Sequence, residues 1–209
     1  YYEEAMEAAH WLVPVLLGLC HQQPENLKDL RRLVNRLASD LPGLHAHHIK
    51  LAPLAAHIVE VVTEQAFEHG FFHATLDARR VRVSIEADTL GRLVLAEFSI
   101  MSSLSTGERE FFVHGATALF NQDYGRLAEL HREAGHVPHD TRAEMLEAEL
   151  RTRAEAHFAA EPEDRSAGSL LHHLLHAVQP FDGAVSGRLA TAQRSFQQAE
   201  MLARALHPG

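Results

Sequence analysis

Four side chains that could do chemistry lie between residues 70 and 104. They are His73, Thr75, Arg80 and Glu97, set among apolar residues on either side of a short alternating segment. The Glu97 carboxylate could ligate a metal ion, and the Arg80 guanidinium could bind a phosphate or carboxylate as a bidentate donor. The permanent charge of Arg80 would oppose a Mg²⁺ ion nearby. A histidine beside apolar residues, such as His73, is more often a hydrogen-bonded core residue than a catalyst.

The sequence around these side chains contains several recognisable blocks. Residues 70–80 read Gly-Phe-Phe-His-Ala-Thr-Leu-Asp-Ala-Arg-Arg, and residues 97–105 read Glu-Phe-Ser-Ile-Met-Ser-Ser-Leu-Ser. Further blocks lie at residues 120–131, 134–138 and 204–208. In order and spacing, the blocks resemble the UbiB/AarF family of atypical kinase-like proteins, which is associated with the biosynthesis of ubiquinone and other prenylquinones. The resemblance covers residues 46–209 and implies the helical C-lobe of a kinase-like fold.

The resemblance also implies that the catalytic motifs are degenerate. Members of the family carry His-Ala-Asp-x-His-Pro-Gly-Asn and then, after a hairpin, Asp-Phe-Gly; kinase-type sites use such Asp and Asn side chains to hold Mg²⁺ and the nucleotide. Here Thr75 stands at the first Asp, Arg80 at the Asn, and Glu97 at the second Asp. Two interpretations of Glu97 stay open. It forms an ion pair with Arg80 that fills the emptied site, or it ligates a metal ion.

The family places its phosphate-binding parts in an N-terminal lobe, with an Ala-rich loop, a Lys-x-Gly-Gln segment and an ion-paired Lys. The residues before Gly70 have helical patterning and contain no convincing copy of these parts. We therefore interpret the chain as a non-catalytic, pseudokinase-type binding or scaffold module, an accessory subunit linked to quinone or lipid metabolism or to a membrane complex, with no cofactor expected. The alternative is a UbiB-type ATPase or kinase that binds ATP and Mg²⁺ through Glu97, with its N-lobe missing or supplied by another chain.

The 17 histidines raise a separate hypothesis. His172 and His176 are one helical turn apart, and residues 45–48 read His-Ala-His-His, both spacings that metal ligands use. Such pairs bind zinc when a third and a fourth ligand converge, but no Cys cluster or His-Glu-x-x-His motif supplies them. A His-rich composition without a specific metal site is the alternative.

Composition limits the partners and the location. The formal charge of −9 argues against a nucleic-acid surface, which would show a basic stripe. The single cysteine, Cys20, lies in the apolar run of residues 11–20, which is too short to span a bilayer. We expect a cytoplasmic protein, with peripheral association with the inner membrane as an open alternative. Its expected partners are a protein or a second copy of the chain, with a lipid, a quinone or a membrane surface as further candidates.

Helical periodicity dominates the chain of 209 residues, which is long enough for one core. Apolar spacing, with Pro and Gly as boundaries, predicts helices over residues 24–42, 53–69, 105–120, 123–134, 141–158, 169–178 and 186–206. Residues 80–85 and 93–95 predict the only clear β-hairpin, and residues 44–50 a linker. The expected fold is mainly α: an N-terminal helical extension over residues 1–45, then a kinase-like C-lobe over residues 46–209 with one small β-hairpin.

Overall fold

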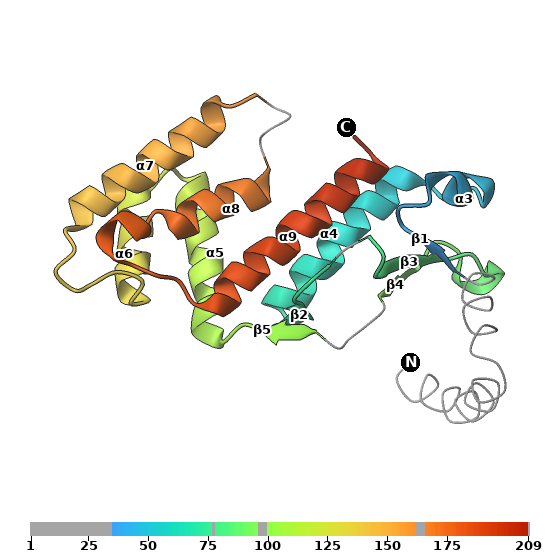
Figure 1. The fold of residues 1–209 in the computed structure, drawn as a ribbon, viewed down its shortest axis with the longest axis horizontal. Helices are drawn as coiled ribbons and strands as arrows, with labels where there is room; N and C mark the ends of the chain where they lie inside the picture. Colours follow the sequence, from blue (N-terminus) through green and yellow to red (C-terminus); the bar gives the residue numbers. More distant parts are fainter. Residues whose placement is uncertain (1–34, 77, 96–99, 162–165, 209) are drawn as a thin grey trace.

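A computed structural model describes residues 35–76, 78–95, 100–161 and 166–208 (Figure 1). The helices in these ranges are α3 (Leu41–Ala46), α4 (Leu51–Phe67), α5 (Thr106–Phe120), α6 (Tyr124–Glu133), α7 (Ala143–Ala159), α8 (Ala167–His176) and α9 (Gly187–Leu206). The strands are β1 (Asn35–Leu37), β2 (Phe71–His73), β3 (Val81–Ser84), β4 (Leu93–Leu95) and β5 (Met101–Ser103). The prediction of a mainly α fold is confirmed.

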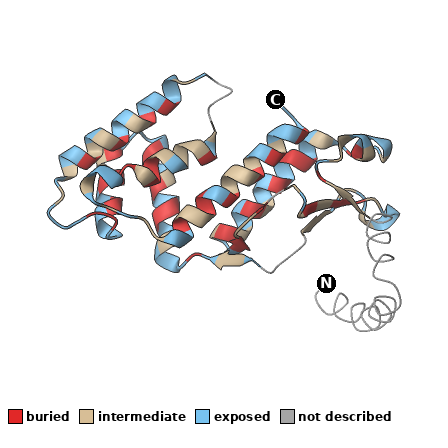
Figure 2. Cartoon of the chain, in the orientation of Figure 1, coloured by how far each residue is buried: buried red, intermediate tan, exposed pale blue. Residues whose placement is uncertain are grey.

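Helices α4 and α9 lie side by side through the middle of the molecule (Figure 1). The sheet of β1, β3 and β4 lies with α3 at one end of this pair, and α5 to α8 lie at the other end. The buried side of α4 follows helical spacing through Leu54, Ile58 and Val62, and Figure 2 shows the buried residues as stripes along the helices. The last helix of the chain therefore connects the sheet end to the helical end.

The buried apolar residues form three clusters along this axis. The first joins α3, α4 and the β3 strand to the end of α9, and the second lies among α5, α6, α7 and α8. The third packs Phe72 of β2 against α5 and α9, with a ring stack of Phe67 on Phe196 at 5.5 Å between centroids. The third cluster holds strand β2, and hence His73, against the helices.

Two small antiparallel sheets surround the segment that carries the motif residues. In the first, β3 pairs with both β1 and β4; in the second, β2 pairs with β5, so that His73 lies opposite Met101. Gly70 ends the turn after α4 with φ of 65°, a left-handed conformation that favours glycine. Its carbonyl accepts the Leu104 N–H at 2.9 Å, which closes the second sheet.

The predicted helix over residues 24–42 is wrong in the part that the structure describes, because Asn35–Leu37 is a strand. Arg36 pairs with Val83 of β3, so the backbone groups on one side of this edge strand are bonded in the sheet. Pro42 lies in the first turn of α3 and begins a helix where the sequence indicated the end of one. Asp40 caps that helix by accepting the Gly43 N–H at 3.1 Å. Residues 24–34 lie outside the described part, as do the rest of residues 1–34, including the apolar run of residues 11–20.

Two further expectations need correction. Residues 44–46 belong to α3, and Leu44 is fully buried, so the expected linker contributes to the core. The β3–β4 hairpin is confirmed, but it is not the only β structure, because β1, β2 and β5 are also present in the described residues. These strands have three residues each, so no alternation could show them in the sequence. The domain division at residue 45 stays a prediction.

The other predicted helices are confirmed within one or two residues at most ends. The capping box of α5 forms as expected: the Ser105 hydroxyl accepts the Glu108 N–H, and the Glu108 carboxylate accepts the Ser105 N–H at 2.8 Å. Among the described residues, no helix has both the length and the apolar character needed to cross a membrane.

Candidate functional site

The structure places three of the four predicted site residues on one short segment. His73 ends strand β2, Thr75 lies in the loop that follows, and Arg80 directly precedes β3. His73 is only 2% exposed, whereas Thr75 and Arg80 are half-buried. Glu97, the predicted metal ligand, lies outside the described residues, so both interpretations of its role stay predictions.

Helix α9 holds this loop from the other end of the sequence. The buried Ser195 hydroxyl donates to the His73 carbonyl at 2.8 Å, and the side-chain carbonyl of Gln198 accepts the Leu76 N–H at 2.7 Å. Both bonds join residues 122 positions apart in the chain. Because they fix backbone groups on both sides of Thr75, the loop conformation depends on the packing of α9.

Arg80 bends back over the same loop. Its Nη1 donates to the Thr75 carbonyl at 3.0 Å. Burial, and secondly the positive charge of Arg80, lower the pKa of His73, so the imidazole is neutral at pH 7. The motif positions thus hold a half-buried threonine, a guanidinium and a buried neutral imidazole, and the positive charge of Arg80 favours anions over Mg²⁺.

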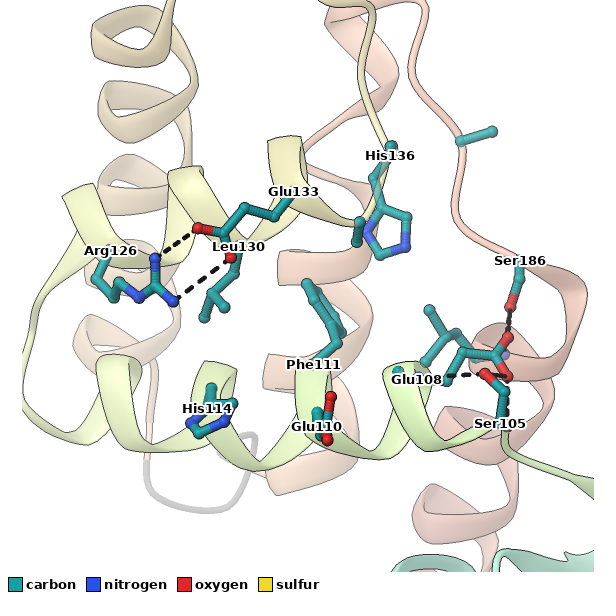
Figure 3. Close-up of a pocket in the computed structure, with 15 residues that line it drawn as sticks. Ser105, Glu108, Glu110, Phe111, His114, Arg126, Leu130, Glu133, His136 and Ser186 are labelled. Carbon is teal, nitrogen blue, oxygen red and sulfur yellow. Dashed lines mark hydrogen bonds and ion pairs between the residues drawn. The ribbon is translucent and has the colours of Figure 1, made fainter.

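A polar pocket lies beside the start of α5, between α6 and the loop that leads into α9 (Figure 3). Its volume is about 690 Å³. The polar side chains that line it are Ser105, Glu108, Glu110, His114, Arg126, Glu133, His136 and Ser186. Arg126 already pairs with Glu133 at 2.9 Å and with Glu129 at 3.1 Å, so part of this lining is neutralised within the protein.

Glu108 organises one wall of the polar pocket. Its carboxylate accepts hydrogen bonds from the Ser105 and Ser186 hydroxyls and lies 3.6 Å from the Arg188 guanidinium. Burial would raise the pKa of Glu108, but these hydrogen bonds and the charge of Arg188 outweigh it and lower the pKa. Glu108 is therefore an anion at pH 7 that joins the first turns of α5 and α9.

The polar pocket is also lined by His136, which forms a buried pair with His131; His131 itself does not line this pocket. His131 and His136 lie with their Nδ1 atoms 3.1 Å apart, so one ring donates its Nδ1–H to the other, and both rings meet the Phe111 ring edge to face. Burial, and then His136, lower the pKa of His131 to about 3; burial also lowers the pKa of His136, against an opposite effect of Glu108. Both rings are neutral at pH 7. The His131 Nε2 is buried without a hydrogen-bond partner among the described residues.

On the far side of His131 lies an almost wholly apolar pocket of about 160 Å³. It is formed by α5, α6 and α8, and its lining includes Phe112, Leu127, Leu171 and Leu174. Phe120 at its edge is 86% exposed, the most exposed large apolar side chain among the described residues. Neither pocket was predicted from the sequence. The only local signals were His131 and His136 on either side of Gly135 and the exposed position of Phe120 at a helix end.

The histidine clusters do not form a multi-ligand metal site in the described part of the chain. There, no group of three or more His, Cys, Asp or Glu side chains converges in a way that could hold an ion. His172 and His176 do lie together, with ring centroids 4.0 Å apart.

Comparison with known families finds a similarity over part of the chain. Residues 31–131 match the ABC1 atypical kinase-like domain. The match runs from just before β1 to the end of α6 and covers 101 of the 209 residues, so it includes the His73–Arg80 loop and strand β5. The resemblance to UbiB-type proteins is thereby supported at the level of this domain type. No solved structure matches the chain significantly.

Proposed function

We propose that this protein is a non-catalytic, pseudokinase-type binding or scaffold module related to UbiB, built on the helical C-lobe of a kinase-like fold. The observation that carries the proposal is the hydrogen bond from Arg80 to the Thr75 carbonyl. It joins the two positions at which the family holds its catalytic Asp and its metal-binding Asn. The similarity of residues 31–131 to the ABC1 atypical kinase-like domain supports the fold on which this comparison depends.

Charge explains why this arrangement disfavours phosphoryl transfer. Kinase-type sites need Mg²⁺ to offset the charge of the nucleotide phosphates, and they bind it with carboxylate and amide oxygens. Arg80 supplies a permanent positive charge at that place, and two unit charges 4 Å apart repel by about 4 kcal/mol at the effective dielectric near a protein surface. A divalent ion doubles the repulsion. Thr75 adds a hydroxyl, which brings no negative charge.

Binding of a partner has its own support at the opposite end of the molecule. Phe120 projects into solvent beside the apolar pocket, and exposed aromatic side chains next to apolar hollows are typical of protein interfaces. We propose a protein partner at this surface, either a different protein or a second copy of the chain. A lipid or quinone tail is the other ligand that such a lining accepts. Cytoplasmic location, with contact at the inner membrane surface, belongs to the same proposal.

Thermal melting with nucleotide tests the non-catalytic assignment. We expect millimolar Mg-ATP or Mn-ATP to leave the melting temperature unchanged, because a ligand stabilises a fold only by binding to it. A rise of several degrees would favour the rival function, a UbiB-type ATPase or kinase that uses Glu97 for the metal. In that case Glu97→Gln should abolish turnover, and unchanged turnover would exclude that role for Glu97.

Light scattering after size-exclusion chromatography tests the proposed partner surface. If a second copy is the partner, Phe120→Glu should convert the oligomer to a monomer. The matched control is Val113→Glu, on the same helix and 51% exposed but outside the pocket lining. An oligomer that survives Phe120→Glu would remove this surface from the interface.

A further inference from the structure

His172 and His176 form a close pair on the surface of α8. Their ring centroids are 4.0 Å apart and the ring planes are inclined by 34°. His172 is exposed and His176 half-buried, so solvent ions reach the pair. A metal ion bound to two imidazole nitrogens at 2.0–2.1 Å holds them about 3.4 Å apart in tetrahedral geometry. To share one ion, the two rings must turn from this contact until one nitrogen of each lies at that separation.

The hydrogen bonding of His176 fixes the form of its ring. The His176 Nδ1 lies 2.8 Å from the His172 carbonyl oxygen, which can only accept, so Nδ1 carries the proton. The Nε2 therefore bears a free lone pair. Histidine ligands of metal ions are commonly oriented in this way, by donation of the other ring N–H to a carbonyl or carboxylate. His176 is thus already in the tautomer that a metal ion requires.

The charges around the pair act in both directions. The pair lies in the last two turns of α8, where the helix dipole favours positive charge. Arg153 of α7 is the opposing charge, but its Nε is 2.6 Å from the Glu149 carboxylate, which offsets it.

From these contacts we propose that His172 and His176 bind one divalent transition-metal ion of the imidazole-preferring kind, Cu²⁺, Ni²⁺ or Zn²⁺. The site is open, because no third His, Cys, Asp or Glu joins the pair within the described ranges, and water fills the other positions. This distinguishes it from a closed structural zinc site, which has four protein ligands. Affinity should follow the usual order for nitrogen ligands, with Cu²⁺ above Ni²⁺ and with Mn²⁺ weakest. The inference is independent of the proposed function.

Calorimetric titration of the metal-free full chain with NiCl₂ at pH 7.5 tests the site. The chain has 17 histidines, and others among them can also bind Ni²⁺ weakly. The test is therefore the difference between the isotherms of the wild type and of His172→Gln. This substitution changes an exposed side chain and leaves the His176 bond to the residue 172 carbonyl in place. We expect the tightest Ni²⁺ equivalent to weaken about tenfold or more, since one of two linked ligands is lost. The double variant His172→Gln/His176→Gln should lose that equivalent entirely.

The control is His69→Gln, an exposed histidine after α4, which should leave the isotherm unchanged. Melting of each variant without metal shows whether the fold is intact. If His176→Gln lowers the melting temperature, His172→Gln alone still decides the outcome. A tightest equivalent that is the same in the wild type and in His172→Gln would overturn the proposal, as would a binding order with Mn²⁺ above Ni²⁺.

Discussion

The loop of residues 73–80 and the polar pocket beside His131 and His136 differ in their sequence motifs and in what their side chains contact. The loop carries the recognisable motif, yet its groups are used internally, by α9 and by Arg80. The pocket carries no motif, yet its cavity of about 690 Å³ is lined by the charged Glu108 carboxylate and by the neutral imidazole of His136, which pairs with the buried His131. The motif residues and the polar pocket therefore lie in different regions of the molecule, and in the loop the bonds described are made within the protein.

The largest effect should come from the packing under the loop. Phe72→Ala removes a fully buried ring and should lower the free energy of unfolding by about 3–5 kcal/mol. The matched control is the neighbouring Phe71, which faces the other side of β2 and is 51% exposed; Phe71→Ala should cost far less. Chemical denaturation measures both. Equal losses would show that the loop side of β2 is not packed as described.

Acid should destabilise the fold through its buried histidines, and His131 has the largest stated shift. His131 has a pKa of about 3 in the fold and 6.5 when unfolded, so between these values the unfolded chain binds a proton that the native state excludes. The stabilising contribution is complete above pH 6.5 and is lost as the pH falls towards 3. Below pH 5.5 and down to about pH 4, the free energy of unfolding should fall more steeply than in His131→Phe, by an amount that approaches about 1.4 kcal/mol per pH unit. Parallel pH profiles for the two proteins would contradict the buried neutral pair.

Removal of the bond that joins α9 to the loop should have a smaller effect. Ser195→Ala leaves the His73 carbonyl without the hydroxyl that donates to it, which should cost about 1–2 kcal/mol. Thr191→Ala on the same helix is the control, because its hydroxyl bonds only within α9, donating to the Gly187 carbonyl and accepting from Arg194. If both variants melt alike, the attachment of the loop to α9 contributes nothing.

The smallest effect should come from the pocket edge. Ser105→Ala removes the cap of α5 and one hydrogen bond to Glu108, and should cost about 1 kcal/mol. Thr106→Ala, one residue further and exposed, should be near neutral. Denaturation midpoints compare the two. If Ser105→Ala lowered the free energy of unfolding more than Ser195→Ala does, the pocket edge would contribute more to stability than the attachment of the loop, contrary to this account.

Most helices were predictable because their ends carry local signals. Ser105 with Glu108, and Gly70 and Gly135 in left-handed conformations, act within a few residues, so the sequence alone contains them. Strands β1, β2 and β5 were not predictable, since three residues show no periodicity and their partners are distant in the chain. Pro42 illustrates the remaining ambiguity, because a proline ends one helix and begins the next with equal ease.

The candidate site was predictable only in part. Thr75 and Arg80 could be placed from the motif, but their hydrogen bond depends on how the loop bends between β2 and β3. His131 and His136 meet because the chain turns at Gly135, where the His136 N–H bonds to the His131 carbonyl at 2.9 Å. Phe111 then buries both rings from another helix. Contacts of this kind come from tertiary packing, which spacing in the sequence does not encode.

Direct calorimetry of nucleotide binding tests the central claim, that Arg80 and Thr75 have replaced the metal site of a kinase-like loop. Mg-ATP is titrated into the wild type and into the double variant Thr75→Asp/Arg80→Asn, which restores the family's side chains at both positions. We predict no saturable heat of binding for the wild type. The double variant shows whether the family's side chains at these two positions are sufficient for binding, and the prediction for the wild type does not depend on it. A one-to-one isotherm for the wild type that disappears when Glu97 is changed to Gln would contradict the claim.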